Sequence, residues 1–136
     1  MMRPGRNLTN PRGLTLIELL IVMSIFGILM GIAIPSYKRS QIKARETVLA
    51  EDLYEMRRAI DAYYVDYKKY PDNLEALVAG KYMRGMPRDP FTFATDSWQC
   101  LPPEPAEDGE QAEGGCFDVV SGSDVVGLNN IPYNQW

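Results

Sequence analysis

The sequence predicts an α+β protein. A long N-terminal α-helical spine, membrane-spanning in its first half, packs on a small C-terminal domain with short antiparallel strands. Three observations support this fold. No residue between Leu19 and Tyr37 is charged, whereas most charged residues lie beyond Lys38. Apolar residues then recur at helical spacing as far as Tyr67. After Pro71 the chain is divided into short segments by Gly and Pro.

These changes in composition predict four regions. Residues 1–13 are polar, basic and contain proline, which is typical of a leader peptide rather than of a folded segment. Residues 14–37 form the transmembrane and assembly half of the helix, and residues 38–70 form its amphipathic half. Residues 71–136 form the small globular α/β domain, which includes an acidic surface loop at residues 101–115.

The apolar segment is long enough to cross a bilayer, because a transmembrane helix needs about 20 apolar residues. It runs from Leu14 to Ile34 and is interrupted only by Thr15, Glu18, Ser24, Gly27 and Gly31. Basic residues flank it on both sides, so the charge bias alone leaves its orientation ambiguous. The arginines at the extreme N-terminus favour a cytoplasmic location for that end (Arg3, Arg6 and Arg12).

The amphipathic half continues the same helix. Its apolar face alternates steps of four and three residues, at Leu49, Leu53, Met56, Ile60, Tyr63 and Tyr67. One helix from about Leu14 to about Tyr67 would be roughly 80 Å long at 1.5 Å per residue. Pro35 cannot donate to the helical hydrogen-bond ladder. We therefore expect a kink or partial melting near Gly27, Gly31 and Pro35, and a membrane helix with ordinary Gly and Pro is the alternative.

The C-terminal region predicts short elements. Asp72 or Asn73 can cap a helix from Leu74 to Ala79, which ends at Gly80. Residues 117–120 and 125–126 are the strand candidates, because they are apolar, β-branched or aromatic and are bounded by glycine.

Composition argues against an enzyme and against a nucleic-acid-binding protein. The chain has no histidine, which removes the commonest general base and the usual partner of a nucleophilic Ser or Cys. Its net charge is −4, from 14 basic and 18 acidic residues. Removal of the three leader arginines would change this to −7, and no long basic tract remains to bind phosphates.

Cys100 and Cys116 are the two cysteines. An even number of cysteines behind an export-like N-terminus predicts a disulfide in an oxidising compartment, and two free thiols are the alternative. The bridge would close the acidic loop.

The segment Gly13-Leu14-Thr15-Leu16-Ile17-Glu18 resembles the processing and assembly signal of the type IV pilin superfamily. The resemblance implies cleavage between Gly13 and Leu14 by a prepilin peptidase, followed by N-methylation of Leu14. Leu14 departs from the more usual Phe.

Glu18 is expected to direct assembly. A carboxylate within an apolar span costs a few kcal/mol, so it usually has a function. Cleavage after Gly13 would create an amine on Leu14, and the resemblance implies that Glu18 pairs with this amine in a neighbouring subunit. The alternative is a tolerated polar residue near the membrane surface.

Gly27 and Gly31 form a G-x-x-x-G pattern that lets apolar helices approach closely.

A second group of residues resembles the major pseudopilin of type II secretion. It comprises Tyr70-Pro71, Leu74, Leu77-Val78, Tyr82-Met83, Met86-Pro87, Asp89-Pro90-Phe91, Trp98 and the segment 117–124. This resemblance implies a structural calcium, for which the candidate ligands are Ser121, Asp124, Asn129 and nearby carbonyls. A second acidic ligand late in the loop is not evident, and an ordinary turn is the alternative. The acidic loop departs from the pseudopilin pattern.

The sequence therefore predicts a non-enzymatic subunit of a type II secretion pseudopilus that polymerises through its N-terminal helix and drives export across the outer membrane. The expected partners are copies of the same chain, the prepilin peptidase, an inner-membrane assembly platform and minor pseudopilins. We expect a single-pass inner-membrane protein whose C-terminal domain is periplasmic, and a filament in the periplasm or at the cell surface. A type IV pilin for adhesion, motility or DNA uptake is the alternative.

A different class of protein would use residues 1–34 as an ordinary signal. Gly31 and Ala33 fit a small-residue cleavage site, which would release a soluble enzyme or binding domain beginning at Ile34. The absence of histidine and of a clustered nucleophile argues against the enzyme.

Overall fold

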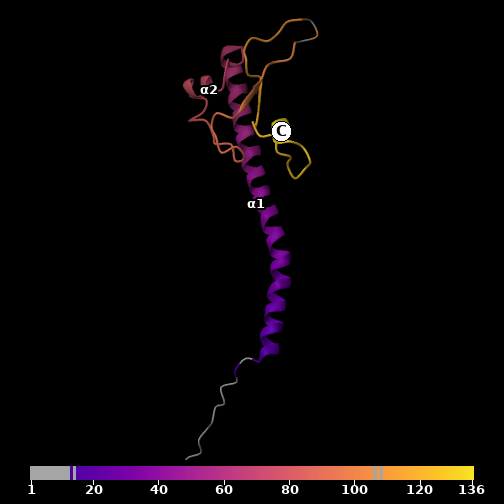
Figure 1. The fold of residues 1–136 in the computed structure, drawn as a ribbon. Coiled ribbons are helices and arrows are strands. Elements are labelled where there is room, and N and C mark those ends of the chain that lie inside the picture. Colours follow the sequence, from indigo (N-terminus) through magenta and orange to yellow (C-terminus); the bar gives the residue numbers. More distant parts are fainter. Residues whose placement is uncertain (1–12, 14, 106, 108) are drawn as a thin grey trace, which may run out of the picture. The chain divides into compact units, whose positions relative to one another are not determined.

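The computed structural model describes Gly13, residues 15–105, Glu107 and residues 109–136 (Figure 1). Helix α1 spans Leu16–Tyr67 and helix α2 spans Glu75–Ala79. Strand β1 spans Gln99–Leu101, strand β2 spans Asp118–Val120, and a 3₁₀ helix, η1, spans Tyr133–Gln135. The chain forms two compact units, residues 1–39 and residues 40–136, which are described separately below.

The first unit contains the apolar half of α1. Its residues from Leu16 to Ile34 are all exposed, because no other described element of this unit covers them. Among the described residues, α1 is the one helix long and apolar enough to cross a membrane. The hydroxyl of Ser24 donates to the carbonyl of Leu20 at 2.7 Å, so this polar group is satisfied within the helix.

Helix α1 continues through Pro35 without a break. The partial melting expected at this position is therefore wrong for the single chain. The missing N–H of Pro35 removes one hydrogen bond, to the carbonyl four residues earlier. The neighbouring turns on either side keep the helical conformation.

In the second unit the predicted apolar face of α1 forms the centre of the core. Leu49, Met56 and Ile60 are fully buried, and Leu53 is 2% exposed. They pack with residues from the rest of the unit: Leu74, Leu77, Trp98, Cys116, Val119 and Tyr133. The face predicted from the sequence is thus confirmed as far as Ile60. Tyr67 remains 55% exposed, and its ring packs against that of Tyr63.

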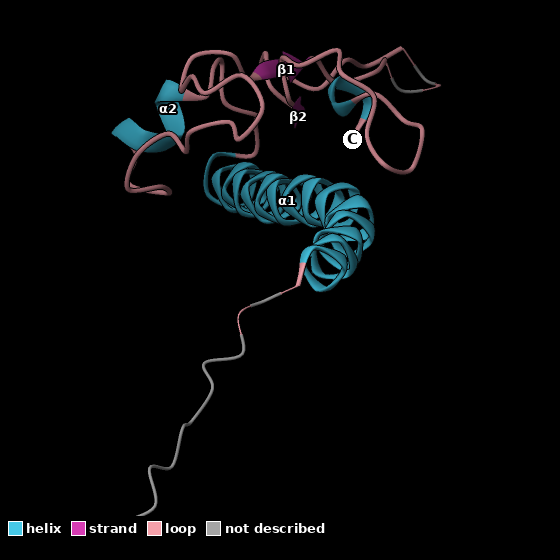
Figure 2. Ribbon diagram, turned by 60° about the horizontal axis from the view of Figure 1, so that its bottom comes forward, coloured by secondary structure: helices cyan, strands magenta, loops and turns pink. Residues whose placement is uncertain are grey.

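The sheet consists of β1 and β2, which pair antiparallel with Cys100 opposite Val119 (Figure 2). Strand β2 confirms the prediction for residues 117–120, whereas β1 was not predicted. The strand expected at residues 125–126 is wrong, since Val126 forms only an isolated bridge with Pro132.

Helix α2 begins and ends close to its predicted limits. The side-chain carbonyl of Asn73 accepts a hydrogen bond from the N–H of Ala76 at 3.0 Å, which confirms Asn73 as the capping side chain. Gly80 follows the last helical residue, and its N–H donates to the carbonyl of Ala76. This short helix contributes Leu77 to the core.

Two charged side chains of α1 tie the helix to the C-terminal segments. The guanidinium of Arg57 donates to the carboxylate of Asp118 at 2.7 Å and to the carbonyls of Val119 and Trp136 at 3.1 and 2.7 Å. The carboxylate of Glu46 accepts from the N–H of Leu128 at 2.7 Å and from the hydroxyl of Tyr133 at 2.9 Å. The last segment of the domain is therefore fixed by polar contacts as well as by its buried rings.

Asp89 connects two loops inside the second unit, where its side chain is fully buried. One carboxylate oxygen accepts from the N–H groups of Phe91 and Thr92, and the other accepts from the hydroxyl of Ser121. A buried carboxylate needs such donors, because its transfer from water is otherwise very costly. These bonds hold the Asp89-Pro90-Phe91 turn against the segment after β2.

Candidate assembly segment

The start of α1 is capped by its own sequence. Thr15 precedes the first helical residue, and its hydroxyl accepts a hydrogen bond from the N–H of Glu18 at 3.3 Å. The Thr15 carbonyl accepts the first helical bond, from the N–H of Leu19. Thr at the cap with Glu three residues later is the spacing of a capping box. The sequence interpretation missed this role of Thr15, although the spacing itself was visible.

Glu18 lies in the first turn of α1 and is exposed. A negative charge is stabilised there, because the first-turn N–H groups give the helix N-terminus a partial positive charge. Gly13 is also exposed, while Leu14 lies outside the described residues. Cleavage between Gly13 and Leu14 and N-methylation of Leu14 therefore stay predictions.

Glu18 and the two glycines of the apolar segment lie on different faces of α1. Gly27 and Gly31 follow Glu18 by nine and thirteen residues, which places them about 180° and about 220° around the helix. No atom lies within 4 Å of a Cβ placed at either glycine. If subunits bundle through this helix, Glu18 and the glycine face would contact different neighbours.

The disulfide predicted between Cys100 and Cys116 is present. It joins β1 to the residues just before β2, and Cys116 is fully buried. Backbone bonds fix the end of the enclosed loop, since the N–H of Tyr70 donates to the carbonyl of Glu113 and the N–H of Gly115 donates to the carbonyl of Pro71. The disulfide and these backbone hydrogen bonds therefore hold the ends of the acidic loop beside the C-terminal end of α1.

Calcium binding at Ser121, Asp124 and Asn129 stays a prediction, and the structure shows the present contacts of these side chains. The hydroxyl of Ser121 donates to the Asp89 carboxylate and accepts from the N–H of Ser123. The side-chain carbonyl of Asn129 accepts from the N–H of Ile131, and Asp124 is exposed. No group of three His, Cys, Asp or Glu side chains in the described part of the chain is placed to hold a metal.

Burial and hydrogen bonding raise the pKa of four titratable groups of the second unit, and one of them is Tyr70, where burial is the main cause. Burial and the hydrogen bond to Glu46 raise the pKa of Tyr133 to about 12. The hydrogen bond from Tyr82 to Asp66, followed by burial, raises the pKa of Tyr82. Burial, followed by repulsion from nearby acids, raises the pKa of the Asp52 carboxyl. Because these groups are scattered, they indicate structural contacts rather than a catalytic centre.

A family model for the prokaryotic N-terminal methylation motif matches residues 8–34. The type II secretion system core protein G of Klebsiella pneumoniae is 29% identical, over 92% of this chain and 94% of that protein. Core protein G of Vibrio cholerae is 31% identical, over 58% of this chain and 64% of that protein. The type IV wide pilus major component PilA4 of Thermus thermophilus is 36% identical, over 52% of this chain and 53% of that protein.

No solved structure is significantly similar to the chain. The methylation motif covers the capped start and the apolar half of α1, and the Klebsiella relative extends the similarity through the second unit. Both agree with a long apolar helix followed by a small two-stranded region. The chain therefore carries the prokaryotic N-terminal methylation motif and is similar over most of its length to core protein G of a type II secretion system.

Proposed function

We propose that this protein is a structural subunit of a type II secretion pseudopilus, which polymerises through α1 and drives protein export across the outer membrane. The observation that carries the proposal is the first half of α1. Its apolar side chains are exposed on every face, and its single acid lies in the first turn. Such a helix is stable only in a bilayer or among other apolar helices. In a filament, the apolar helices of neighbouring subunits would surround this segment.

Before assembly, α1 would anchor the chain in the inner membrane with the second unit in the periplasm. An oxidising compartment agrees with the Cys100–Cys116 bridge. After cleavage at Gly13, Glu18 would pair with the new amine of a neighbouring subunit. The prepilin peptidase, an inner-membrane platform and minor pseudopilins are the partners that this route requires.

The mature mass tests the processing step. We expect loss of residues 1–13 together with the addition of one methyl group. Cleavage after Ala33 instead would leave a soluble domain without the apolar helix and would refute the proposal.

Assembly is tested with Glu18→Ala and, as a control in the same helix, Ser24→Ala. The Glu18 variant should insert into the membrane and be processed but should not form filaments. Normal filaments with this variant would refute the role of the carboxylate.

The second candidate is a type IV pilin, which is favoured by the similarity to the Thermus pilus component and to the major pilin PilE1 of Neisseria gonorrhoeae. Deletion of the gene separates the two functions. Loss of secretion with intact surface pili supports the pseudopilus, and the reverse outcome supports the pilus.

Calcium binding is a separate proposal that rests on the pseudopilin resemblance alone. A calorimetric titration of the full chain in detergent should show heat and a rise in melting temperature if calcium binds. The absence of both would remove this proposal.

A further inference from the structure

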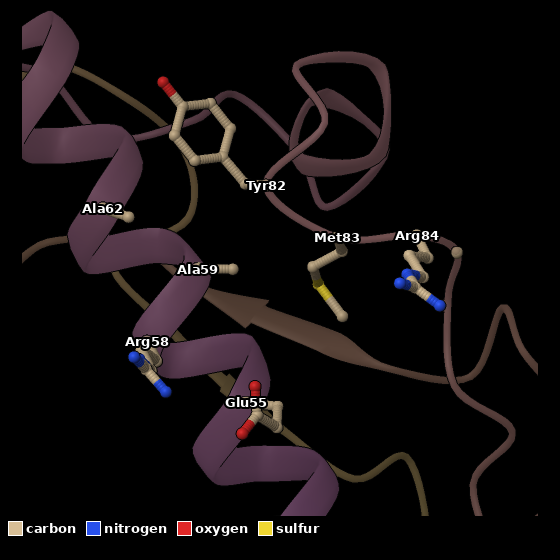
Figure 3. Close-up of a pocket in the computed structure, with 8 residues that line it drawn as sticks. Glu55, Arg58, Ala59, Ala62, Tyr82, Met83 and Arg84 are labelled. Carbon is tan, nitrogen blue, oxygen red and sulfur yellow. The ribbon is translucent and has the colours of Figure 1, made fainter.

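The second unit contains a basic groove of about 440 Å³ along the side of α1 (Figure 3). Arg58, Ala59 and Ala62 line it from α1, and Tyr82, Met83 and Arg84 line it from the loop after α2. The two alanines leave room beside the helix, and the Met83 side chain points into this space (Figure 3). The groove thus combines an apolar floor with an arginine on each wall.

The charge of the groove is largely unbalanced within the chain. Residues 81–88 include Lys81, Arg84 and Arg88 and no acid. Glu55 is the one acid among the lining residues. Neither Arg58 nor Arg84 forms an ion pair with any residue that the structure describes. These cations remain available for an anionic partner.

The loop at residues 101–115 has the opposite character. It contains five acids and no base in its sequence, and Glu104, Glu107 and Glu110 are exposed. Its ends are fixed by the Cys100–Cys116 bridge and by the bonds to Tyr70 and Pro71. The described ends of the loop are therefore held in place on the surface of the unit.

The described part of the loop lies away from the groove of its own chain. Both ribbon views show α2, which the basic segment directly follows, and the acidic loop at opposite sides of the second unit (Figures 1 and 2). Two complementary surfaces on opposite sides of one subunit fit a head-to-tail contact, which generates an open helical filament when the rotation does not close.

We propose that the acidic loop of one subunit docks in the basic groove of a neighbouring subunit in the filament. The occupant is the set of exposed acids Glu104, Glu107 and Glu110 of a second copy, selected by charge complementarity. This inference rests on the proposed filament function and adds to the contacts of the apolar helix. It gives the acidic loop a role in lateral packing, and it offsets part of the repulsion between subunits of equal net negative charge.

Charge reversal on each surface tests the contact in the full-length chain. Arg58→Glu with Arg84→Glu should lower the filament yield roughly tenfold, because exposed ion pairs change an equilibrium up to about fivefold each and reversal adds repulsion. Glu107→Lys with Glu110→Lys should have a similar effect. The fourfold variant, whose net charge equals that of the original chain, should recover most of the yield.

Lys68→Glu with Lys69→Glu is the matched control, because both lysines are exposed, lie outside the groove and give the same change in net charge. Filament yields that fall equally in the control and in the groove variant, or that the fourfold variant does not recover, would overturn the inference. Glu18→Ala is run in parallel. If the unmodified chain forms no filaments, the proposed function fails and not merely this contact.

A cysteine pair tests the same contact directly, since both native cysteines are paired in the bridge. Arg84→Cys combined with Glu110→Cys should give covalent multimers in filaments under oxidising conditions, and each single variant should give at most a dimer. Filaments that contain both cysteines without any covalent ladder would also overturn the inference.

Discussion

Removal of the disulfide should strongly destabilise the second unit. The bridge joins residues 16 apart in sequence. The chain-entropy model gives about 3 kcal/mol for a closed loop of this size. The variant Cys100→Ser with Cys116→Ala avoids an unpaired hydroxyl at the position that is fully buried. For a domain of this size, about 3 kcal/mol corresponds to a melting temperature lower by roughly 12–24 °C.

Tryptophan fluorescence is a suitable assay because the two tryptophans of the chain, Trp98 and Trp136, both lie in the second unit. Trp98 is 8% exposed and should report directly on the loss of the core. Urea unfolding of the full chain in detergent would compare the unmodified protein, the same protein after reduction, and the double variant. The reduced protein and the variant should unfold at similar urea concentrations.

A loss in the free energy of unfolding below about 1 kcal/mol would refute the entropic argument for this loop. The backbone bonds from Tyr70 and Gly115 would then be sufficient to order it without the bridge. If reduction has a large effect and the double variant has none, the destabilisation comes from the buried thiol rather than from the open loop.

Three further changes test the packing and charge of the second unit. Asp52→Asn should raise the melting temperature at neutral pH and not below pH 3.8, because burial followed by nearby acids raises the pKa of this carboxyl and its ionisation opposes folding. The free energy of unfolding should fall between about pH 10 and about pH 12 as Tyr133 ionises more readily in the unfolded chain. Tyr133→Phe, which loses the bond to Glu46, should reduce this fall in a pH series of urea titrations. Gly122→Ala should cost about 1–3 kcal/mol in the same titration, because its Cβ would lie 2.2 Å from the carbonyl oxygen of Ser97; an unchanged midpoint would contradict this close approach.

The sequence predicted the parts of the fold that depend on periodicity. The steps of four and three residues from Leu49 to Ile60 repeat one helical face, and those residues form the core. The cap at Asn73 and the stop at Gly80 were visible because these residue types favour helix ends. The processing motif could also be recognised, since its residues are consecutive in the sequence, from Gly13 to Glu18.

Features that depend on contacts between distant residues could not be predicted. Strand β1 has no alternating pattern over its three residues and is defined by its pairing with β2. Arg57 belongs to the polar side of the helix in the sequence pattern, yet it contacts residues 61 to 79 positions later. Asp89 is typical of a turn before proline, and only the folded chain shows that it is buried against Ser121.

The assembly role of Glu18, Gly27 and Gly31 stays a prediction. Glu18, Gly27 and Gly31 were recognised from the apolar segment, but the opposite faces that they occupy follow from the continuity of α1. The partial melting predicted near Pro35 was wrong, because one missing hydrogen bond is outweighed by the intact turns around it.

The ties between α1 and the last described segment have a consequence for how the domain forms during synthesis. Glu46 and Tyr133 are 87 residues apart, and Arg57 and Trp136 are 79 apart, so these contacts have high contact order. The ribosome synthesises the core residues of α1 first, namely Leu49, Met56 and Ile60. Their shared core is complete only after Tyr133 has been synthesised. Until Tyr133 has been synthesised, the nascent chain therefore exposes part of this apolar surface, which favours aggregation or binding by a chaperone in that interval.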